Sequence, residues 1–384
     1  MSDTTTEQTG ASHASRRSFR ERVAGLPKPV KIVAWVLLAV LLYLLPIINP
    51  PILTTPDIDF GGVLLTVTLY VLVALGLNIV VGYAGLLDLG YVGFYAVGAY
   101  GVAVLTSQQA SWPFLLALPV AVLAALVSGV ILGAPTLRVR GDYLAIVTLG
   151  FGEIIRLIAV NSESLGAASG IPGVGTPPSI ELFDVPKLVW DGGVASVNVD
   201  DTSTFLLFSV VDLIPYYWLT LTVVFLVIWA DIRIKASRVG RAWEACREDE
   251  DAAELMGVPT FKFKLLAFAM GAFIGGLSGA LYAGKQGFIS PNSFLLLFSI
   301  LFIAAVVVGG QGNRWGVIVG AVLVAYLPER FREFTEWRVL VFGIALMLLA
   351  SFRPQGLLPP RRTVRARKLE ERLGALQEGG DRRA

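Results

Sequence analysis

The chain has 384 residues, of which 55% are hydrophobic and 16% are charged, and its formal net charge is +2 at pH 7. This apolar fraction is above that of typical soluble domains and predicts a membrane protein. The near-neutral charge gives no reason to expect nucleic acid as a partner. A single cysteine (Cys246) and a single histidine (His13) exclude an internal disulfide and Cys- or His-based metal centres, and they argue against an enzyme.

Ten apolar stretches are predicted to cross the lipid bilayer, because a helix needs roughly twenty apolar residues to span a hydrocarbon layer about 30 Å thick. The predicted spans are residues 32–49, 60–81, 82–105, 113–134, 143–160, 213–230, 265–284, 294–308, 316–327 and 338–352. The expected fold class is therefore all-α, a polytopic transmembrane helical bundle with about ten spans. Residues 31–353 form the transmembrane domain, between a disordered tail (1–30) and a basic tail (354–384).

The basic residues predict the orientation of this bundle. They gather in the segments 16–31, 138–140, 233–247 and 353–368 and at Arg314, and ten spans place all of them on one side of the membrane. By the positive-inside rule this side is cytoplasmic, so both termini are expected in the cytoplasm of a multi-pass plasma-membrane protein. The polar segment 161–212 then forms a small extracytoplasmic subdomain.

The loop 231–264 carries fourteen charged residues, whereas the flanking stretches 213–230 and 265–284 carry none. Within it, residues 237–257 predict one or two short helices that stop at Gly257, just before Val258 and Pro259. Alanines together with Leu255 and Met256 give these helices a small apolar face with charged edges. That pattern favours docking into a groove of another protein; the alternative is a solvated connector.

The stretch 82–90, with the sequence GYAGLLDLG, is expected to interrupt the helical pattern. Each glycine in it costs roughly 1 kcal/mol relative to alanine within a helix. In membranes, such breaks occur where protein shelters the backbone or where it lines a watery cavity. Asp88 is the only charged residue between positions 60 and 137, and two roles stay open for it: a cap for the helix that follows, or a residue of a translocation pathway.

Three further residues are candidates for such a pathway. Asn78 on the second span and Thr148 on the fifth can offer hydrogen bonds to a polar solute. Glu153 lies three residues before Arg156, so the two share a helix face and can pair. This pair suits a role inside the bundle or, alternatively, a contact with the solute. The candidate pathway residues are therefore Asn78, Asp88, Thr148 and Glu153.

Two glycine patterns have a structural interpretation. The spacing from Gly279 to Gly284 and Lys285 resembles a phosphate-binding loop, but Gln286 stands where Ser or Thr would bind magnesium, and the segment ends an apolar span. We therefore expect no nucleotide hydrolysis by this chain. Other glycines recur four residues apart and are expected to let helices pack closely in lipid. They are Gly271, Gly275, Gly279, Gly312, Gly316 and Gly320.

Several segments together resemble the LivM branch of bacterial branched-chain amino-acid ABC importer permeases, over residues 60–359. They are GLNIVVGYAGLLDLGYVGFYAVGAY (76–100), LRVRGDYLAIVTLGFGEIIR (137–156), SRVGRAWEACREDEDAAELMGV (237–258), SPNSFLLLFSILFIAAVVVGGQGNRWG (290–316) and RPQGLLP (353–359). The family commonly carries a Gly-Gly-Pro-Asn-Gly-Ile-like stretch after the fifth span, and here Gly166-Ala167-Ala168-Ser169-Gly170-Ile171 stands in its place.

The resemblance implies an importer subunit in the bacterial inner membrane that works by alternating access. It implies four partners: a homologous second permease, two ATP-binding subunits and an extracytoplasmic solute-binding protein. No cofactor is expected in this chain, because the ATP is used by the partner subunits. The loop 231–264 becomes the segment that couples to an ATPase. The implied coupling residues are Arg241, Glu250, Ala252, Ala253 and Gly257.

Other functions stay open at this point. Related permeases serve urea, amides and other amino acids, so the solute is not fixed by the resemblance. An ion-coupled secondary transporter is a second class, with Asp88 or Glu153 as the ion site. A membrane enzyme is a third class, which the shortage of His and Cys disfavours.

Overall fold

The computed structural model describes residues 28–51, 53–54, 59–137, 142–179, 184–191, 194–204, 207–208, 212–330, 343–344, 347, 351–352 and 356–358. The chain divides into two units, Met1–Leu45 and Pro46–Ala384. Helix α2 (Lys28–Ile48) begins in the first unit and ends in the second, with Pro46 in its last turn. Most of the predicted tails, 1–27 and 359–384, lies outside the described residues.

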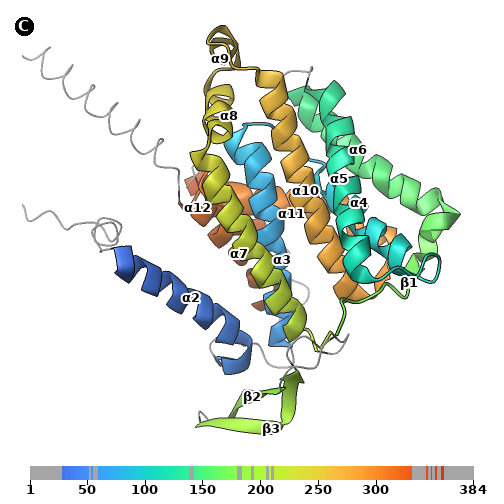
Figure 1. Cartoon of the computed structure of the whole chain (residues 1–384), viewed down its shortest axis with the longest axis vertical. Helices are drawn as coiled ribbons and strands as arrows, with labels where there is room; N and C mark the ends of the chain where they lie inside the picture. Colours follow the sequence, from blue (N-terminus) through green and yellow to red (C-terminus); the bar gives the residue numbers. More distant parts are fainter. Residues whose placement is uncertain are drawn as a thin grey trace, which may run out of the picture. The chain divides into compact units, whose positions relative to one another are not determined.

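The second unit is a bundle of helices (Figure 1). Its α-helices are α3 (Phe60–Leu77), α4 (Tyr91–Thr106), α5 (Phe114–Thr136), α6 (Asp142–Asn161), α7 (Ile214–Ala236), α8 (Arg238–Glu248), α9 (Glu250–Leu255), α10 (Thr260–Gln286), α11 (Leu296–Gly309) and α12 (Arg314–Arg330). A π-helix, η1 (Asn78–Tyr83), continues α3, and three 3₁₀-helices are η2 (Glu163–Leu165), η3 (Ala167–Ser169) and η4 (Pro291–Phe294). These elements confirm the predicted all-α class.

Helix α3 begins where the sequence supplies a cap. The Asp59 carboxylate accepts hydrogen bonds from the backbone N–H groups of Gly61 (3.1 Å) and Gly62 (2.9 Å), which satisfies two donors that a helix start leaves open. The helix runs on through η1, and residues 84–90 are irregular. The predicted break is therefore confirmed, but the expected third span was wrong by nine residues at its start, because Gly82 still belongs to η1 and α4 begins at Tyr91.

Helix α10 is the centre of the bundle and packs against α3, α4 and α5 (Figure 1). Its small residues allow this close packing. A Cβ on Gly279 would lie 1.9 Å from the Tyr95 carbonyl oxygen of α4, and a Cβ on Gly276 would lie 2.2 Å from the Ala125 side chain of α5. Aromatic rings of Tyr91, Phe94 and Phe268 fill the space beside them.

The predicted glycine faces are confirmed for α10 and only in part for α12. Gly316 and Gly320 pack against backbone of α11, with their added Cβ positions 2.3 Å from the Gly309 oxygen and 2.1 Å from the Ala305 oxygen. Gly312, in contrast, precedes α12 and sits in a turn with φ +81°. It is therefore not part of a helix face.

The segment 161–212 contains the η2 and η3 turns and most of the β-structure. Strands β2 (Asp184–Asp191) and β3 (Val194–Thr204) form an antiparallel hairpin at the end of the bundle opposite α8 and α9 (Figure 1). Strand β1 (Ile171–Pro172) pairs antiparallel with β4 (Phe288–Ile289), which ties the segment to the end of α10.

Among the described residues, five helical segments are long and apolar enough to cross a membrane. They are Phe60–Tyr83, Phe114–Thr136, Tyr143–Asn161, Thr260–Gln286 and Pro291–Gly309, and two shorter apolar helices are Val33–Ile48 and Tyr91–Thr106. The predicted sixth and ninth spans correspond to α7 and α12. The predicted tenth span, 338–352, lies almost entirely outside the described residues, so the number ten stays a prediction.

The crossing of α4 and α10 gives a first prediction. Replacing Gly279 by alanine should lower the unfolding temperature by several degrees, because the new methyl group overlaps the Tyr95 carbonyl and overpacking costs about 1–3 kcal/mol. The matched control is Gly150→Ala on α6, where an added Cβ has nothing within 4 Å. The measurement is thermal unfolding of both variants in detergent. Equal unfolding temperatures would contradict the close packing.

Candidate functional site

Helices α8 and α9 form the predicted docking segment, and the sequence caps both of them. The Ser237 hydroxyl accepts from the Val239 N–H (3.1 Å) at the start of α8. The Asp249 carboxylate accepts from the Ala252 N–H (2.9 Å) at the start of α9. These N-cap residues end one helix and begin the next, which confirms the prediction of two short helices.

Three contacts attach this helix pair to the beginning of α10. The fully buried Trp243 indole donates to the Phe263 carbonyl (2.7 Å). Lys264, itself 9% exposed, forms an ion pair with Glu250. The hydroxyl of Thr260 donates to the Glu254 carboxylate (2.6 Å). Helices α8 and α9 are therefore fixed to a helix that passes through the centre of the bundle.

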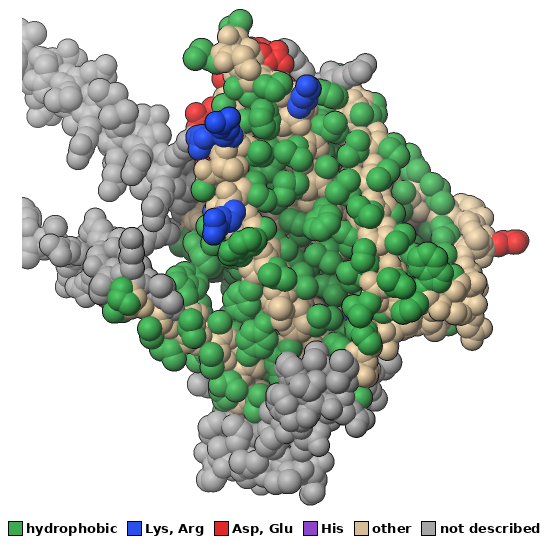
Figure 2. Space-filling view, in the orientation of Figure 1, with side chains coloured by type: hydrophobic (Ala, Val, Ile, Leu, Met, Phe, Trp, Pro, Cys, Tyr) green, Lys and Arg blue, Asp and Glu red, His purple; other side chains and the backbone are tan. Residues whose placement is uncertain are grey.

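The far end of α9 carries an exposed apolar tip. Leu255 is 88% exposed and Met256 is 85% exposed, and Gly257 follows with φ +83°, a backbone conformation that favours glycine. The charged side chains in view gather mainly at this end of the bundle, whereas the sides are mostly hydrophobic (Figure 2). An exposed apolar tip within a charged surface is the pattern of a protein-binding site.

The five predicted coupling residues occupy different positions in this segment. Ala252 and Gly257 are exposed beside the tip, and Arg241 is exposed on α8, where it donates to the Ala236 carbonyl (3.2 Å). Ala253 is buried, and Glu250 is the half-buried partner of Lys264. The first three residues are therefore exposed and the other two support the segment, and a coupling role for the five stays a prediction.

Arg247 joins α8 to the π-helix η1. Its guanidinium donates to the Gly82 carbonyl, which lies where the chain is about to leave the helix. The Gly312 N–H donates to the Asn78 side-chain oxygen (2.9 Å) one turn away in η1. We call Asn78, Gly82, Arg247 and Gly312 the glycine junction. It brings together α8, the end of the second predicted span and the turn before α12.

Glycine is required twice in the glycine junction. A Cβ on Gly82 would lie 2.0 Å from the Asn78 oxygen, and Gly312 has φ +81° with its Cβ position 2.8 Å from an Arg247 nitrogen. Neither site has room for a side chain. π-helical turns often mark functional sites in membrane and soluble proteins, and here the widened turn receives contacts from two other parts of the chain.

A charged cluster lies beside the junction. Asp231 of α7 is 4% exposed, forms an ion pair with Arg314 (3.0 Å) and accepts a hydrogen bond from the Tyr83 hydroxyl (3.1 Å). Lys235 donates to the Gly312 carbonyl (2.8 Å) and lies over the Tyr83 ring, 4.2 Å from its centroid. This cluster fixes α7 and α12 to η1.

Sequence reasoning missed most of these contacts. The residues concerned are Tyr83, Asp231, Lys235, Trp243, Arg247, Lys264, Gly312 and Arg314. A signal was available for Asp231 and Arg314, since each is a charged residue at the border of an apolar stretch. Their pairing across more than eighty positions of sequence could not be read from spacing.

The predicted pathway residues lie at different places in the described part of the bundle. Asn78 is fully buried in the glycine junction. Asp88, 1% exposed, accepts from the Gly90 N–H (3.0 Å), and Thr148 on α6 accepts from the neighbouring Leu89 N–H (3.0 Å). Asp88 and Thr148 therefore hold residues 84–90 in place. A pathway role for any of these residues stays a prediction.

Glu153 and Arg156 form the predicted pair on α6. The Arg156 Nε donates to both carboxylate oxygens of Glu153, at 3.0 Å each. The side chains are 40% and 21% exposed, respectively, so the pair lies on the outside of the described chain. In the described chain alone, the interpretation that the pair faces the inside of the bundle was therefore wrong.

Cys246 lies on α8 in the charged loop. The thiol is buried under α8, and burial raises its pKa, so little of it is the reactive thiolate at neutral pH. A hollow of about 260 Å³ opens beside it, between residues 84–87 and the loop segment. The phosphate-loop lookalike is also helical, since Gly279 to Gln286 belong to α10.

Comparison with known proteins identifies the family. The model of the family "Branched-chain amino acid transport system / permease component" matches residues 60–350. The chain belongs to this family. The match covers the whole bundle from α3 to the predicted tenth span, including α8, α9 and the glycine junction.

Individual relatives agree with this assignment. The chain is 42% identical over 298 residues to the high-affinity branched-chain amino acid transport system permease protein LivM of Escherichia coli, covering 77% of this chain and 68% of that protein. It is 25% identical to the probable branched-chain amino acid transport permease protein LivM of Methanocaldococcus jannaschii, over 78% of this chain and 93% of that protein. No solved structure matches.

A second permease protein of the same transport system is also similar. The Escherichia coli permease protein LivH is 31% identical over 124 residues, covering 30% of this chain and 40% of that protein. These relatives are transport permeases, which confirms the predictions of a permease and of a protein that is not an enzyme.

The glycine junction gives a second prediction. Arg247→Met should lower the free energy of unfolding by about 1–3 kcal/mol, because it leaves the Gly82 carbonyl without its donor in a part-buried position. Arg241→Met on the same helix is the control and should change it by less than about 0.5 kcal/mol, since Arg241 is exposed. Unfolding in detergent checks both, and a larger loss for Arg241→Met would refute the assignment.

Proposed function

We propose that this chain is the membrane-spanning permease subunit of an ABC importer for branched-chain amino acids in the bacterial inner membrane, with α8, α9 and both termini in the cytoplasm. The observation that carries the proposal is the exposed Leu255–Met256 tip on a helix pair fixed to α10 and η1. Family membership and the LivM relatives support the solute class.

In the proposed mechanism, an ATPase subunit binds the tip and moves α8 and α9 when ATP closes the paired motor subunits. The ion pair from Glu250 to Lys264 transmits the movement to α10, and the contact from Arg247 to Gly82 transmits it to η1. Because α10 and α3 are packed without space between them, they shift as rigid bodies. Such a shift is what alternating access between two states of a bundle requires.

The proposed assembly contains four further subunits. A homologous second permease completes the pathway, two ATP-binding subunits use ATP, and a solute-binding protein delivers the amino acid from outside. The likeness of this chain to both LivM and LivH supports a pair of related permeases. The segment 161–212, at the end of the bundle away from the tip, suits contact with the solute-binding protein (Figure 1).

The exposed tip gives a third prediction. The double variant Leu255→Ser/Met256→Ser should reduce uptake at least tenfold, because truncating the few residues that dominate an interface costs about 2 kcal/mol or more, or roughly thirtyfold in affinity. Its amount in the membrane should be unchanged, since both side chains are exposed. Uptake of labelled solute and immunodetection in membranes measure the two effects.

The control for the tip variant is Arg238→Ser, an exposed change at the start of the same helix pair, which should retain uptake. Wild-type uptake by the tip variant would contradict ATPase docking at this place. Loss of the variant from the membrane would instead point to a folding role of the tip.

A fourth prediction concerns solute and energy source. In a deletion strain complemented with this chain, labelled leucine uptake should be suppressed by excess isoleucine or valine and not by urea. ATP depletion should stop it, whereas a protonophore that leaves ATP intact should not. If excess urea suppressed leucine uptake, the proposed solute class would be wrong. If uptake stopped with the protonophore while ATP stayed intact, an ion-coupled transporter would be favoured.

A further inference from the structure

The two outer helices α5 and α6 differ in chemistry, although both are largely unburied in the described chain. The window of α5 that could cross a membrane is 33% buried and that of α6 is 28% buried. Phe114–Thr136 contains no charged residue, and its exposed side chains are aliphatic: Leu115, Leu116, Val120, Leu123, Val127 and Ile131. This surface suits contact with lipid acyl chains.

Helix α6 carries the Glu153–Arg156 ion pair near the middle of its span. At 1.5 Å per residue, Glu153 lies roughly 15 Å from Tyr143 and roughly 12 Å from Asn161. The Glu153 side chain is 40% exposed. Charged groups at that depth face protein or water rather than lipid. The reason is that hydrocarbon cannot form hydrogen bonds with the carboxylate oxygens and guanidinium N–H groups that the ion pair itself leaves unpaired.

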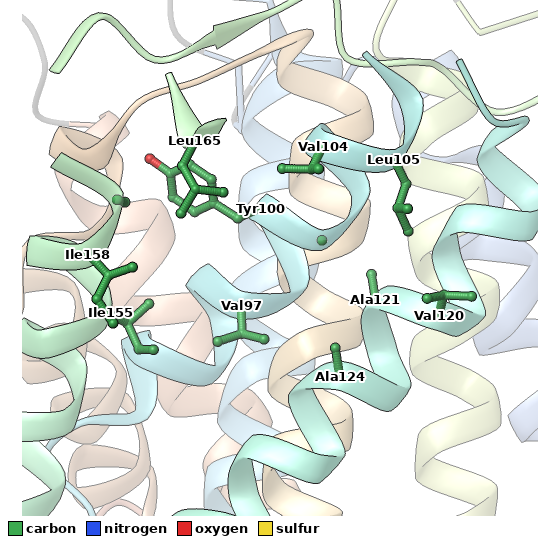
Figure 3. A pocket seen from close by; sticks show the side chains of 12 residues that line it. Val97, Tyr100, Val104, Leu105, Val120, Ala121, Ala124, Ile155, Ile158 and Leu165 are labelled. Carbon is green, nitrogen blue, oxygen red and sulfur yellow. The ribbon is translucent and has the colours of Figure 1, made fainter. Parts of the chain in front are cut away.

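The ion pair points away from the side of α6 that faces α4. Ile155 and Ile158 point from α6 into a hollow of about 350 Å³ that Val97 and Tyr100 of α4 also line (Figure 3). The lining of this hollow is almost entirely apolar. Successive helix residues are turned by about 100°, so Glu153 lies on the opposite side of α6 from Ile155.

Helix α11 carries further exposed apolar side chains beside α6. Leu297 and Ile300 of α11 are 59% and 53% exposed, and α11 and η4 contact α6 directly. Leu157 of α6 is 44% exposed and follows Glu153 by one helical turn, so the two residues lie on the same face of α6. The result is an apolar helical surface that contains one half-open ion pair, and polar side chains inside membranes hydrogen-bond across helix interfaces.

We propose that the α6 face bearing Glu153 and Arg156 binds the homologous second permease. A lipid surface would leave the pair partly unsatisfied, whereas a second helical bundle can supply polar groups at the same depth. Two related permease proteins, LivM and LivH, both carry the name of the branched-chain amino acid transport system, and a related second permease is therefore the occupant that we assign to this face. This inference rests on the proposed function, which requires a second permease.

The test introduces a photoreactive residue, p-benzoyl-phenylalanine, into the full chain. This chain is co-expressed with the homologous second permease from the same organism. It is placed at Leu157 on α6 or at Leu123 on α5, which is 56% exposed and serves as the matched control. After illumination in membranes, the adducts are identified by peptide mass spectrometry. We expect the Leu157 position to attach to the second permease and the Leu123 position to give no protein adduct.

Three outcomes would overturn the inference: permease adducts from Leu123 and not from Leu157, adducts of Leu157 to a second copy of this chain, or adducts of Leu157 to residues 338–352 of the same chain. Failure of the wild-type chain to co-purify with the second permease would count against the proposed function itself. Co-purification without the Leu157 adduct would count against the α6 face alone.

A second measurement uses bulky substitutions on the same two helices. Leu157→Trp should reduce the fraction of second permease that co-purifies by at least fivefold, because the larger ring interferes with close helix packing. Leu123→Trp, facing lipid, should leave that fraction unchanged. Thermal unfolding of each variant chain separates loss of association from loss of folding. Equal association of both variants would also overturn the inference.

Discussion

The contact between Arg247 and the Gly82 carbonyl connects the exposed helix pair to the bundle. It depends on the π-helical turn η1, which ends α3 and leaves this carbonyl to a donor from α8. Gly312 completes the arrangement through Asn78. Neither Gly82 nor Gly312 has room for a side chain. A substitution at either glycine would therefore disturb the contacts of α8 with the end of the second predicted span and with the turn before α12.

The arrangement has a mechanical consequence. Trp243, Glu250 and Glu254 fix α8 and α9 to α10, and Arg247 fixes them to η1. Helix α10 packs on α3, α4 and α5 through glycines and alanines that allow almost no adjustment. A force applied at Leu255 and Met256 therefore reaches the centre of the bundle through short contacts between rigid elements, and the same contacts explain why polar residues are buried at that end.

Two ion pairs of the described bundle differ in their surroundings. Asp231 and Arg314 are buried against each other and hold α7, α12 and η1 together. Glu153 and Arg156 also pair but remain half-open on α6. The first pair stabilises the fold of one chain, whereas the second marks the α6 face that we propose binds the second permease.

The sequence by itself determined the class of this protein, most of its helices and the location of the charged loop. Long apolar stretches, caps such as Asp59, Ser237 and Asp249, and glycine breaks are local signals, and membrane helices satisfy their own backbone, so these elements follow from local sequence. The resemblance of its segments to known permeases also identified the family.

Only the tertiary structure decided which residues work together. Asn78 and Gly312 are 234 positions apart, and Gly82 and Arg247 are 165 apart; no spacing rule predicts such pairs, because they depend on how helices cross. For the same reason, the sequence did not show that Asp88 and Thr148 hold the same loop. It also left open whether Glu153 and Arg156 face the bundle interior or contact the solute. The neighbouring helices decide whether a helix face lies inside or outside the bundle, and the sequence of one helix does not specify those neighbours.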